Sequence, residues 1–130
     1  MIVVDASVIA SALIDDSPGG ERARDRLRGE RLAAPHVLDL EVVAVWRRQA
    51  AAGRWTARRV SLALADLRDL PVRRARHVEL LPRCWELRDN VTTYDAAYVA
   101  LAEALEVTLI TADRRLARTS GVHCTVELVA

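Results

Sequence analysis

The sequence predicts an α/β sandwich built on a mainly parallel central sheet. Short apolar runs typical of strands stand near both ends of the chain, over 1–4 and 124–129. Between them lie longer segments with helical spacing of apolar residues, the clearest over 36–52 and 93–106. Strands separated by helices in this way favour parallel pairing, because each crossover needs the length of a helix.

Local signals place the remaining elements. Gly53 and Pro71 mark helix ends, Thr56 is a helix cap, and Ser17-Pro18-Gly19-Gly20 predicts a turn over 15–20. The expected strands are Met1–Val4, one ending at Ala33–Pro35, a weak edge strand Val72–Arg76, Val107–Thr111 and Cys124–Val129. The expected helices are Ala6–Ile14, Glu21–Arg28, His36–Ala52, 56–70, Val78–Arg88, Thr93–Glu106 and the short Asp113–Arg118.

Length and composition narrow the class of protein. A chain of 130 residues is expected to form one domain with a substantial core. No apolar run approaches the roughly 20 residues that span a bilayer. Asp5 interrupts the first apolar run and no basic leader precedes it, so no signal peptide is expected. Cys84 and Cys124 form neither a disulfide framework nor a CxxC pair, which favours a reducing, cytoplasmic setting.

All nineteen basic residues are arginine, and lysine is absent. This excludes a P-loop, a Schiff-base enzyme and a phospho-accepting receiver domain, because each uses a lysine. Any phosphate contact must therefore come from arginine or from the backbone. Codon usage alone can explain the bias, but the consequence for chemistry is the same.

Four acidic residues lie within or at the end of apolar segments, where a solvated carboxylate is not expected. They are Asp5, Glu41, Asp95 and Asp113. An unpaired buried carboxylate shifts its pKa, pairs with a cation or binds a metal. Because ligand sites of parallel sheets form at the carboxyl ends of strands, Asp5 and Asp113 are candidates for one rim. All four together would make an all-oxygen site suited to Mg²⁺ or Mn²⁺.

Each carboxylate also has an ordinary structural explanation. Asp5 and Asp113 suit helix N-caps, and Thr92-x-x-Asp95 resembles a capping box. Glu41 has only apolar neighbours one turn away, so its alternative is an ion pair with Arg47, Arg48 or another helix. Each alternative is reasonable for one residue alone; that all four hold at once is harder to accept.

Other candidate groups are weaker. The three histidines have no zinc spacing, and no GxSxG motif or activated cysteine context is present. Trp46, Trp55 and Trp85 suit core or interface positions better than base stacking. Arginines over 73–76 and 114–118 would suit a phosphate path, although such clusters usually form solvated faces. Asp5-Ala6-Ser7 resembles a haloacid-dehalogenase phosphatase motif, but the second aspartate and the lysine are missing.

Four blocks together resemble a PIN domain, and most closely the VapC-type toxins of bacterial type II toxin–antitoxin systems. The resemblance covers the whole chain, 1–130, as a single PIN domain. The blocks are Ile2–Val8, Glu41 on the helix after Pro35, Thr93–Ala102 and Leu109–Leu116.

The resemblance implies a three-layer α/β/α fold and an Mg²⁺- or Mn²⁺-dependent endoribonuclease with one or two ions. It also implies a homodimer and a cognate antitoxin that covers the site. By position, Asp5, Glu41, Asp95 and Asp113 become the catalytic and metal-binding acids. Ser7 and Thr111 match the supporting hydroxyls. The family often has further acidic or polar residues after the fourth acid, whereas this chain continues Arg114-Arg115-Leu116, so that position depends on Asp113 alone.

Two other functions remain open from sequence. A PIN-like domain could keep its acids for folding or for binding a protein partner, without catalysis. The same cluster could also serve a metal-dependent DNA nuclease or phosphatase, since carboxylate–metal chemistry does not itself select ribose. For the endoribonuclease, hydrolysis by metal-activated water is expected to leave a 5′-phosphate and a 3′-hydroxyl.

Overall fold

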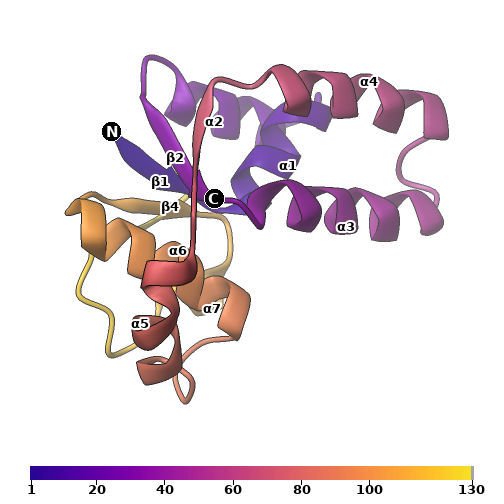
Figure 1. The fold of residues 1–130 in the computed structure, drawn as a ribbon. Helices are drawn as coiled ribbons and strands as arrows, with labels where there is room; N and C mark the ends of the chain where they lie inside the picture. Colours follow the sequence, from indigo (N-terminus) through magenta and orange to yellow (C-terminus); the bar gives the residue numbers. More distant parts are fainter. Residues whose placement is uncertain (130) are drawn as a thin grey trace.

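A five-stranded, all-parallel sheet forms the centre of the molecule, with helices packed around it (Figure 1). The computed structural model describes residues 1–129. Its strands are β1 (Ile2–Val4), β2 (Leu32–Pro35), β3 (Val72–Ala75), β4 (Leu109–Thr111) and β5 (Val126–Leu128). Its helices are α1 (Ala6–Ile14), α2 (Pro18–Leu27), α3 (Leu38–Ala51), α4 (Ala57–Asp69), the 3₁₀ turn η1 (Val78–Leu80), α5 (Leu81–Glu86), α6 (Thr93–Leu105) and α7 (Arg114–Ala117).

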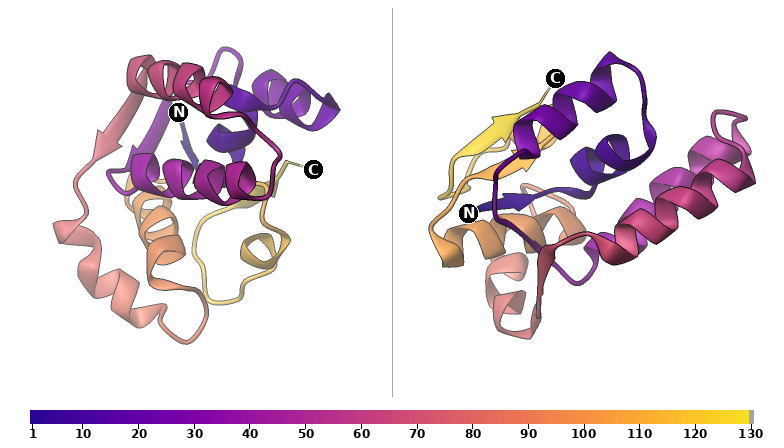
Figure 2. Two further views of the ribbon diagram at one scale, coloured as in Figure 1. Left: turned by 90° about the vertical axis from the view of Figure 1, so that its right-hand side faces the viewer. Right: turned by 90° about the horizontal axis from the view of Figure 1, so that it is seen from above.

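The strand order is β3-β2-β1-β4-β5, so the chain changes direction across the sheet between β1 and β4. From β1 it builds outward through β2 to β3, and it then returns to the other side of β1 for β4 and β5. The sheet lies between α2 and α6 (Figure 2), which gives the expected three-layer α/β/α arrangement. In such folds the carboxyl ends of the strands on either side of this point form the usual ligand site.

The core is made almost entirely of aliphatic side chains, as the absence of phenylalanine requires. Strands β1, β2 and β4 are buried at every position because helices cover both of their faces. Val72–Ala75 is an edge strand, as its weak pattern predicts. No helix within residues 1–129 has both the length and the apolar character needed to cross a membrane.

One expectation from sequence is wrong. Ser17-Pro18-Gly19-Gly20 is not a free turn, since α2 already begins at Pro18 with Ser17 as its N-cap residue. Proline is tolerated there because the first helical residue needs no backbone N–H bond. Of the core and interface positions that the sequence left open for Trp46, the structure shows the core: the side chain is fully buried, and its indole N–H donates to the Ala10 carbonyl at 3.1 Å.

Gly20 provides a test of the contact between α1 and α2. A Cβ atom at this position would lie 1.7 Å from the Asp15 carbonyl oxygen, which is backbone and cannot rotate away. We expect Gly20→Ala to lower the free energy of unfolding by about 1–3 kcal/mol or more, measured by urea denaturation.

Gly19→Ala is the matched control, because the nearest contact of its Cβ would be Asp15 Oδ2 at 3.7 Å, an ordinary van der Waals distance. Its stability should equal or slightly exceed that of the wild type, since alanine favours the helix. Equal destabilisation by both substitutions would show that close packing at Gly20 is not the cause.

Candidate functional site

The four acidic residues come from four different elements that meet at one end of the sheet. Asp5 follows β1 directly, and Asp113 lies two residues beyond β4. Glu41 lies in the first turn of α3, which follows β2, and Asp95 lies in the first turn of α6. The site is therefore placed at the carboxyl ends of β1, β2 and β4, where sheet topology predicts it.

A hydrogen-bond network fixes the Asp5 carboxylate between β1 and β4. Ser7 Oγ and Thr111 Oγ1 both donate to Asp5 Oδ2, at 2.6 and 2.9 Å. Each hydroxyl also accepts a backbone N–H, Ser7 from Ala112 and Thr111 from Asp113, both at 3.0 Å. Each hydroxyl accepts the backbone N–H through its oxygen and has a single proton to donate. Both hydroxyls donate that proton to Asp5. The supporting role expected for Ser7 and Thr111 thus has a structural basis.

The capping explanation fails for Asp5, because its side chain makes no cap hydrogen bond to α1. It holds for Asp113, whose Oδ1 accepts the Arg115 backbone N–H at 2.8 Å as the N-cap of α7. At the start of α6 the cap is Thr92, and Asp95 contributes only its backbone N–H to that bond. The Asp95 carboxylate accepts no backbone N–H at this helix start, although the Thr92 side chain beside it acts to lower its pKa.

Glu41 is the clearest departure from ordinary packing. It makes no ion pair within residues 1–129, so the expected alternative of an arginine partner is not realised. Its Oε1 atom is buried without a hydrogen-bond partner, and so is the hydroxyl of Tyr98. The two groups are near enough to affect each other's pKa, but their geometry is not that of a hydrogen bond. Such orphaned atoms are rare because each costs desolvation energy without compensation.

The carboxylates also perturb one another electrostatically. Burial raises the pKa of Asp5, Glu41 and Asp95 above the ordinary values. Neighbouring negative charges raise these pKa values further, because like charges disfavour ionisation. Asp113 acts on Asp5, Asp5 and Asp95 act on Glu41, and Asp5 and Asp113 act on Asp95. These couplings show that the four side chains share one electrostatic environment.

The four acids do not form a preassembled metal site. No group of three or more acidic, histidine or cysteine side chains in residues 1–129 is already arranged to hold a metal ion. The donors are nevertheless hard oxygens, and Glu41 Oε1 lacks any partner. Their chemistry fits Mg²⁺ or Mn²⁺, which prefer carboxylate oxygen and water. Asp95 and Asp113 also line a cavity of about 400 Å³ that extends to Arg88 and Arg115.

Tyr98 belongs to this site although no sequence motif marks it. It lies one turn after Asp95 on the buried face of α6, where an aromatic residue is normally part of the core. Its hydroxyl is buried near Glu41, which lies on a different helix. This proximity arises from the packing of α3 near α6 and cannot be seen in the sequence.

Comparison with known proteins agrees with this geometry. A family model of the PIN domain matches residues 2–122, a range that contains all four acids. Ribonuclease VapC9 of Mycobacterium tuberculosis is 44% identical over 129 residues, covering 99% of this chain and 98% of the relative.

The chain belongs to the PIN-domain family of VapC ribonucleases.

Solved structures of lower identity share the fold of this VapC family member. The Mycobacterium tuberculosis toxin VapC20, which cleaves the sarcin–ricin loop, has a TM-score of 0.72 at 17% identity. The match covers 94% of this chain and 96% of VapC20. A toxin–antitoxin complex from Klebsiella pneumoniae has a TM-score of 0.63 at 16% identity, covering 95% and 93% of the two chains. The chain therefore shares its overall fold with these solved structures.

The raised pKa values of this VapC-type cluster lead to a stability prediction. An acid whose pKa is higher in the folded state keeps protons that the unfolded chain releases, so stability falls as pH rises above about 4. Asp95→Asn removes one charge from the cluster. We expect it to raise the melting temperature at about pH 7.5 in EDTA and to have little effect near pH 4, measured by circular dichroism.

Asp66→Asn is the matched control, because Asp66 is exposed on α4 and lies outside the cluster. It should leave the melting temperature unchanged at both pH values. A lower melting temperature for Asp95→Asn at neutral pH would contradict the proposed repulsion among the acids.

Proposed function

We propose that this protein is an endoribonuclease toxin that hydrolyses RNA phosphodiester bonds with Mg²⁺ or Mn²⁺ and is neutralised by a cognate antitoxin. The observation that carries the proposal is the convergence of Asp5, Glu41, Asp95 and Asp113 at the strand ends, with Glu41 Oε1 buried and unpartnered. Such an arrangement is unfavourable for a purely structural site, whereas a divalent cation would compensate it. The chain is proposed to act as one domain, since the sheet takes strands from near both ends of the sequence.

The four carboxylates would hold one or two cations. A bound cation would supply a water activated for attack on phosphorus and would neutralise charge on the phosphate oxygens. The chain's own contribution is to orient the ligands. Ser7 and Thr111 fix Asp5 Oδ2, and Tyr98 stands beside Glu41. With no lysine in the chain, no lysine ammonium group can compete with the cation for these acids.

RNA is the proposed substrate because the full-length relative at 44% identity is named a ribonuclease. An acidic cluster alone repels a polyanion, so arginines beside it must supply the attraction. Arg88 and Arg115 line the cavity that Asp95 and Asp113 also line, which meets this requirement.

The proposed antitoxin contact includes the exposed side of α3. Leu40 and Val43 flank Glu41 along this helix and are 74% and 39% exposed. A partner that covers these apolar residues would also lie close to the acidic cluster. The Klebsiella pneumoniae complex, which shares the fold, supports such a partner. A homodimer stays a prediction from the family resemblance. Trp46 is in the core, so it cannot form part of a dimer interface.

Cleavage of RNA by the purified, antitoxin-free chain tests the proposal. We expect discrete fragments from total cellular RNA with Mg²⁺ or Mn²⁺, carrying a 5′-phosphate and a 3′-hydroxyl, and none in EDTA. Asp5→Asn should reduce the rate by about a hundredfold or more, because outer-shell changes at metal sites already cost about 10- to 100-fold.

Asp66→Asn, a change of the same charge on an exposed residue of α4, should cleave like the wild type. DNA of matched sequence should remain intact, which separates this function from a DNA nuclease. Cleavage that persists both in EDTA and in Asp5→Asn would overturn the four-carboxylate mechanism. Mn²⁺ binding without any cleavage would instead favour the non-catalytic binding module.

The hydroxyl network leads to a separate prediction. Thr111→Val keeps the shape of a fully buried side chain but removes its bond to Asp5 Oδ2. We expect Mn²⁺ affinity to fall by about 10- to 100-fold, measured by isothermal titration calorimetry, because the Asp5 carboxylate loses one of two orienting bonds. Thr108→Val is the control, because Thr108 precedes β4 and lies outside the network. Unchanged Mn²⁺ affinity in Thr111→Val would show that Ser7 alone is sufficient.

A further inference from the structure

A cavity adjoins the acidic cluster and is lined partly by residues outside it. It lies between the segment 88–92, which precedes α6, and the region of α7 that follows Asp113. Its volume of about 400 Å³ is within the range of pockets that bind small ligands. Its lining combines two of the acids, Asp95 and Asp113, with two arginines, Arg88 and Arg115. A phosphodiester at the carboxylates would therefore place its neighbouring nucleotide in this cavity.

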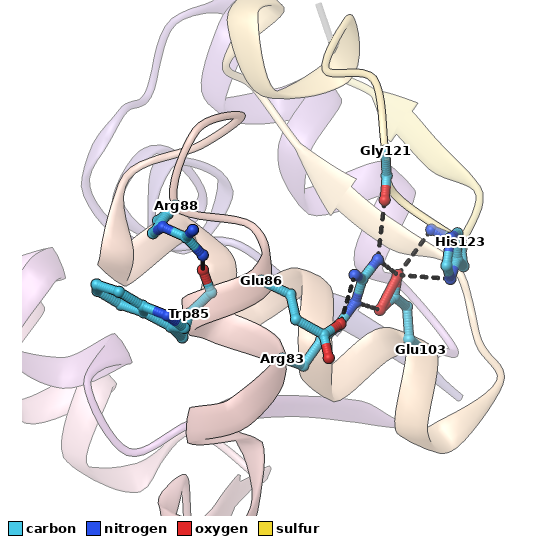
Figure 3. Close-up of polar contacts among 7 residues, drawn as sticks. All are labelled: Arg83, Trp85, Glu86, Arg88, Glu103, Gly121 and His123. Carbon is cyan, nitrogen blue, oxygen red and sulfur yellow. Dashed lines mark hydrogen bonds and ion pairs between the residues drawn. The ribbon is translucent and has the colours of Figure 1, made fainter.

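An exposed tryptophan adjoins the same cavity through Arg88. The Arg88 guanidinium lies over the Trp85 ring, with Cζ 4.5 Å from the ring centroid, and its Nη1 donates to the Trp85 carbonyl at 3.0 Å (Figure 3). Even with this cover, Trp85 is 68% exposed. Arg88 thus holds the indole by one side and leaves most of the residue open to solvent. A large aromatic ring held in this way is a surface on which an unpaired base can stack.

Hydrogen bonds join α5 and the segment after it to α6 and to the loop that follows α7. Arg83, from α5, donates to both carboxylate oxygens of Glu103 at 2.7 and 3.1 Å and to the Gly121 carbonyl at 2.8 Å (Figure 3). Asn90 Nδ2 donates to the Ser120 carbonyl at 3.0 Å. These bonds connect the segment that carries Trp85 and Arg88 to the loop that follows α7. The cavity is therefore preorganised, which lowers the entropy cost of binding.

The arginines at this cavity differ from those used to hold the fold together. Arg26, Arg74 and Arg83 each form ion pairs with acidic side chains. Arg88 makes no ion pair within residues 1–129, and the Arg115 side chain, 95% exposed, reaches Asp113 only at 3.9 Å. Guanidinium groups without a close carboxylate partner remain available for phosphate oxygens.

We propose that Trp85, Arg88 and Arg115 form a subsite for one unpaired nucleotide next to the scissile phosphodiester. The base stacks on the open face of Trp85, and the flanking phosphates contact the two arginines. This inference rests on the proposed ribonuclease function and narrows it, because a base can reach Trp85 only from a single-stranded segment or a loop. Val78 and Leu81, also exposed near Trp85, make a second copy of the chain the competing occupant.

Binding of a short fluorescein-labelled single-stranded RNA tests the subsite, with EDTA present so that no cleavage occurs. Trp85→Ala should weaken binding about 5- to 100-fold, whereas Trp85→Phe should retain most of the affinity, because phenylalanine still stacks. Arg88→Gln should reduce the slope of log affinity against log salt by about 0.7, the value for one lost phosphate contact on a single strand. The same RNA annealed to its complement should show no difference between wild type and Trp85→Ala.

Two matched controls separate the causes. Arg58→Gln removes an equal charge at the start of α4, on the hairpin with α3 that projects away from α5 and α7 (Figure 1), and should leave the salt slope unchanged. Leu81→Ala removes a neighbouring exposed apolar group and should leave RNA affinity unchanged. Wild-type affinity in Trp85→Ala would overturn the subsite. A dimer-to-monomer change in both Trp85→Ala and Leu81→Ala, seen by light scattering, would assign the surface to a second copy instead. Failure of the wild type itself to bind this RNA would also overturn the subsite, whereas the ribonuclease function is tested separately by cleavage with Mg²⁺ or Mn²⁺.

Discussion

Parallel pairing of β1 with β4 is the constraint on which the site depends. The register places Val3 beside Leu109 and Val4 beside Ile110, and the Asp5 backbone N–H continues the ladder to the Ile110 carbonyl at 2.9 Å. Asp5 and Thr111 thereby become neighbours although 106 positions separate them in sequence. A shift by one residue would reverse the side chains of β4 and remove Thr111 from Asp5. The position of the first carboxylate is thus set by strand register.

The buried pairing also explains how the fold tolerates its charges. Val3, Val4, Leu109 and Ile110 are fully buried, so the strands that carry Asp5 and Thr111 belong to the most protected part of the core. Buried aliphatic area contributes about 25 cal/mol per Å², whereas repulsion among the acids acts against folding. Strong packing beneath the site therefore balances unfavourable electrostatics within it. A bound cation would reduce that electrostatic cost without any change in the core.

Sequence patterns predicted the fold and the acids for a clear physical reason. A carboxylate at the end of an apolar strand or on the apolar face of a helix is costly, so its presence is informative even in one sequence. Glu41 illustrates this, since its apolar neighbours predicted a buried acid and the structure places Oε1 there without a partner. Other features depended on three-dimensional contacts that no local pattern contains. The start of α2 at Pro18 depends on the close approach of Gly20 to Asp15, and the importance of Tyr98 depends on α3 meeting α6.

The three tryptophans show most plainly what sequence could not decide. Identical side chains have different environments: Trp46 is fully buried, Trp55 is partly buried, and Trp85 is exposed with Arg88 against its ring. The core position of Trp46 follows from its helix lying against α1, where the Ala10 carbonyl satisfies the indole N–H. Trp85 lies on α5, which packs against α6 through the buried Cys84, and its own side chain stays exposed with Arg88 against the ring. An acidic site repels RNA, so basic groups beside it must attract the phosphates, and in this chain they can only be arginines. Arg88, which lies against Trp85, lines the same cavity as Asp95 and Asp113. In the proposed function the acids would determine where the phosphodiester is cleaved, and in the proposed subsite the adjacent stack would admit unpaired strands to them.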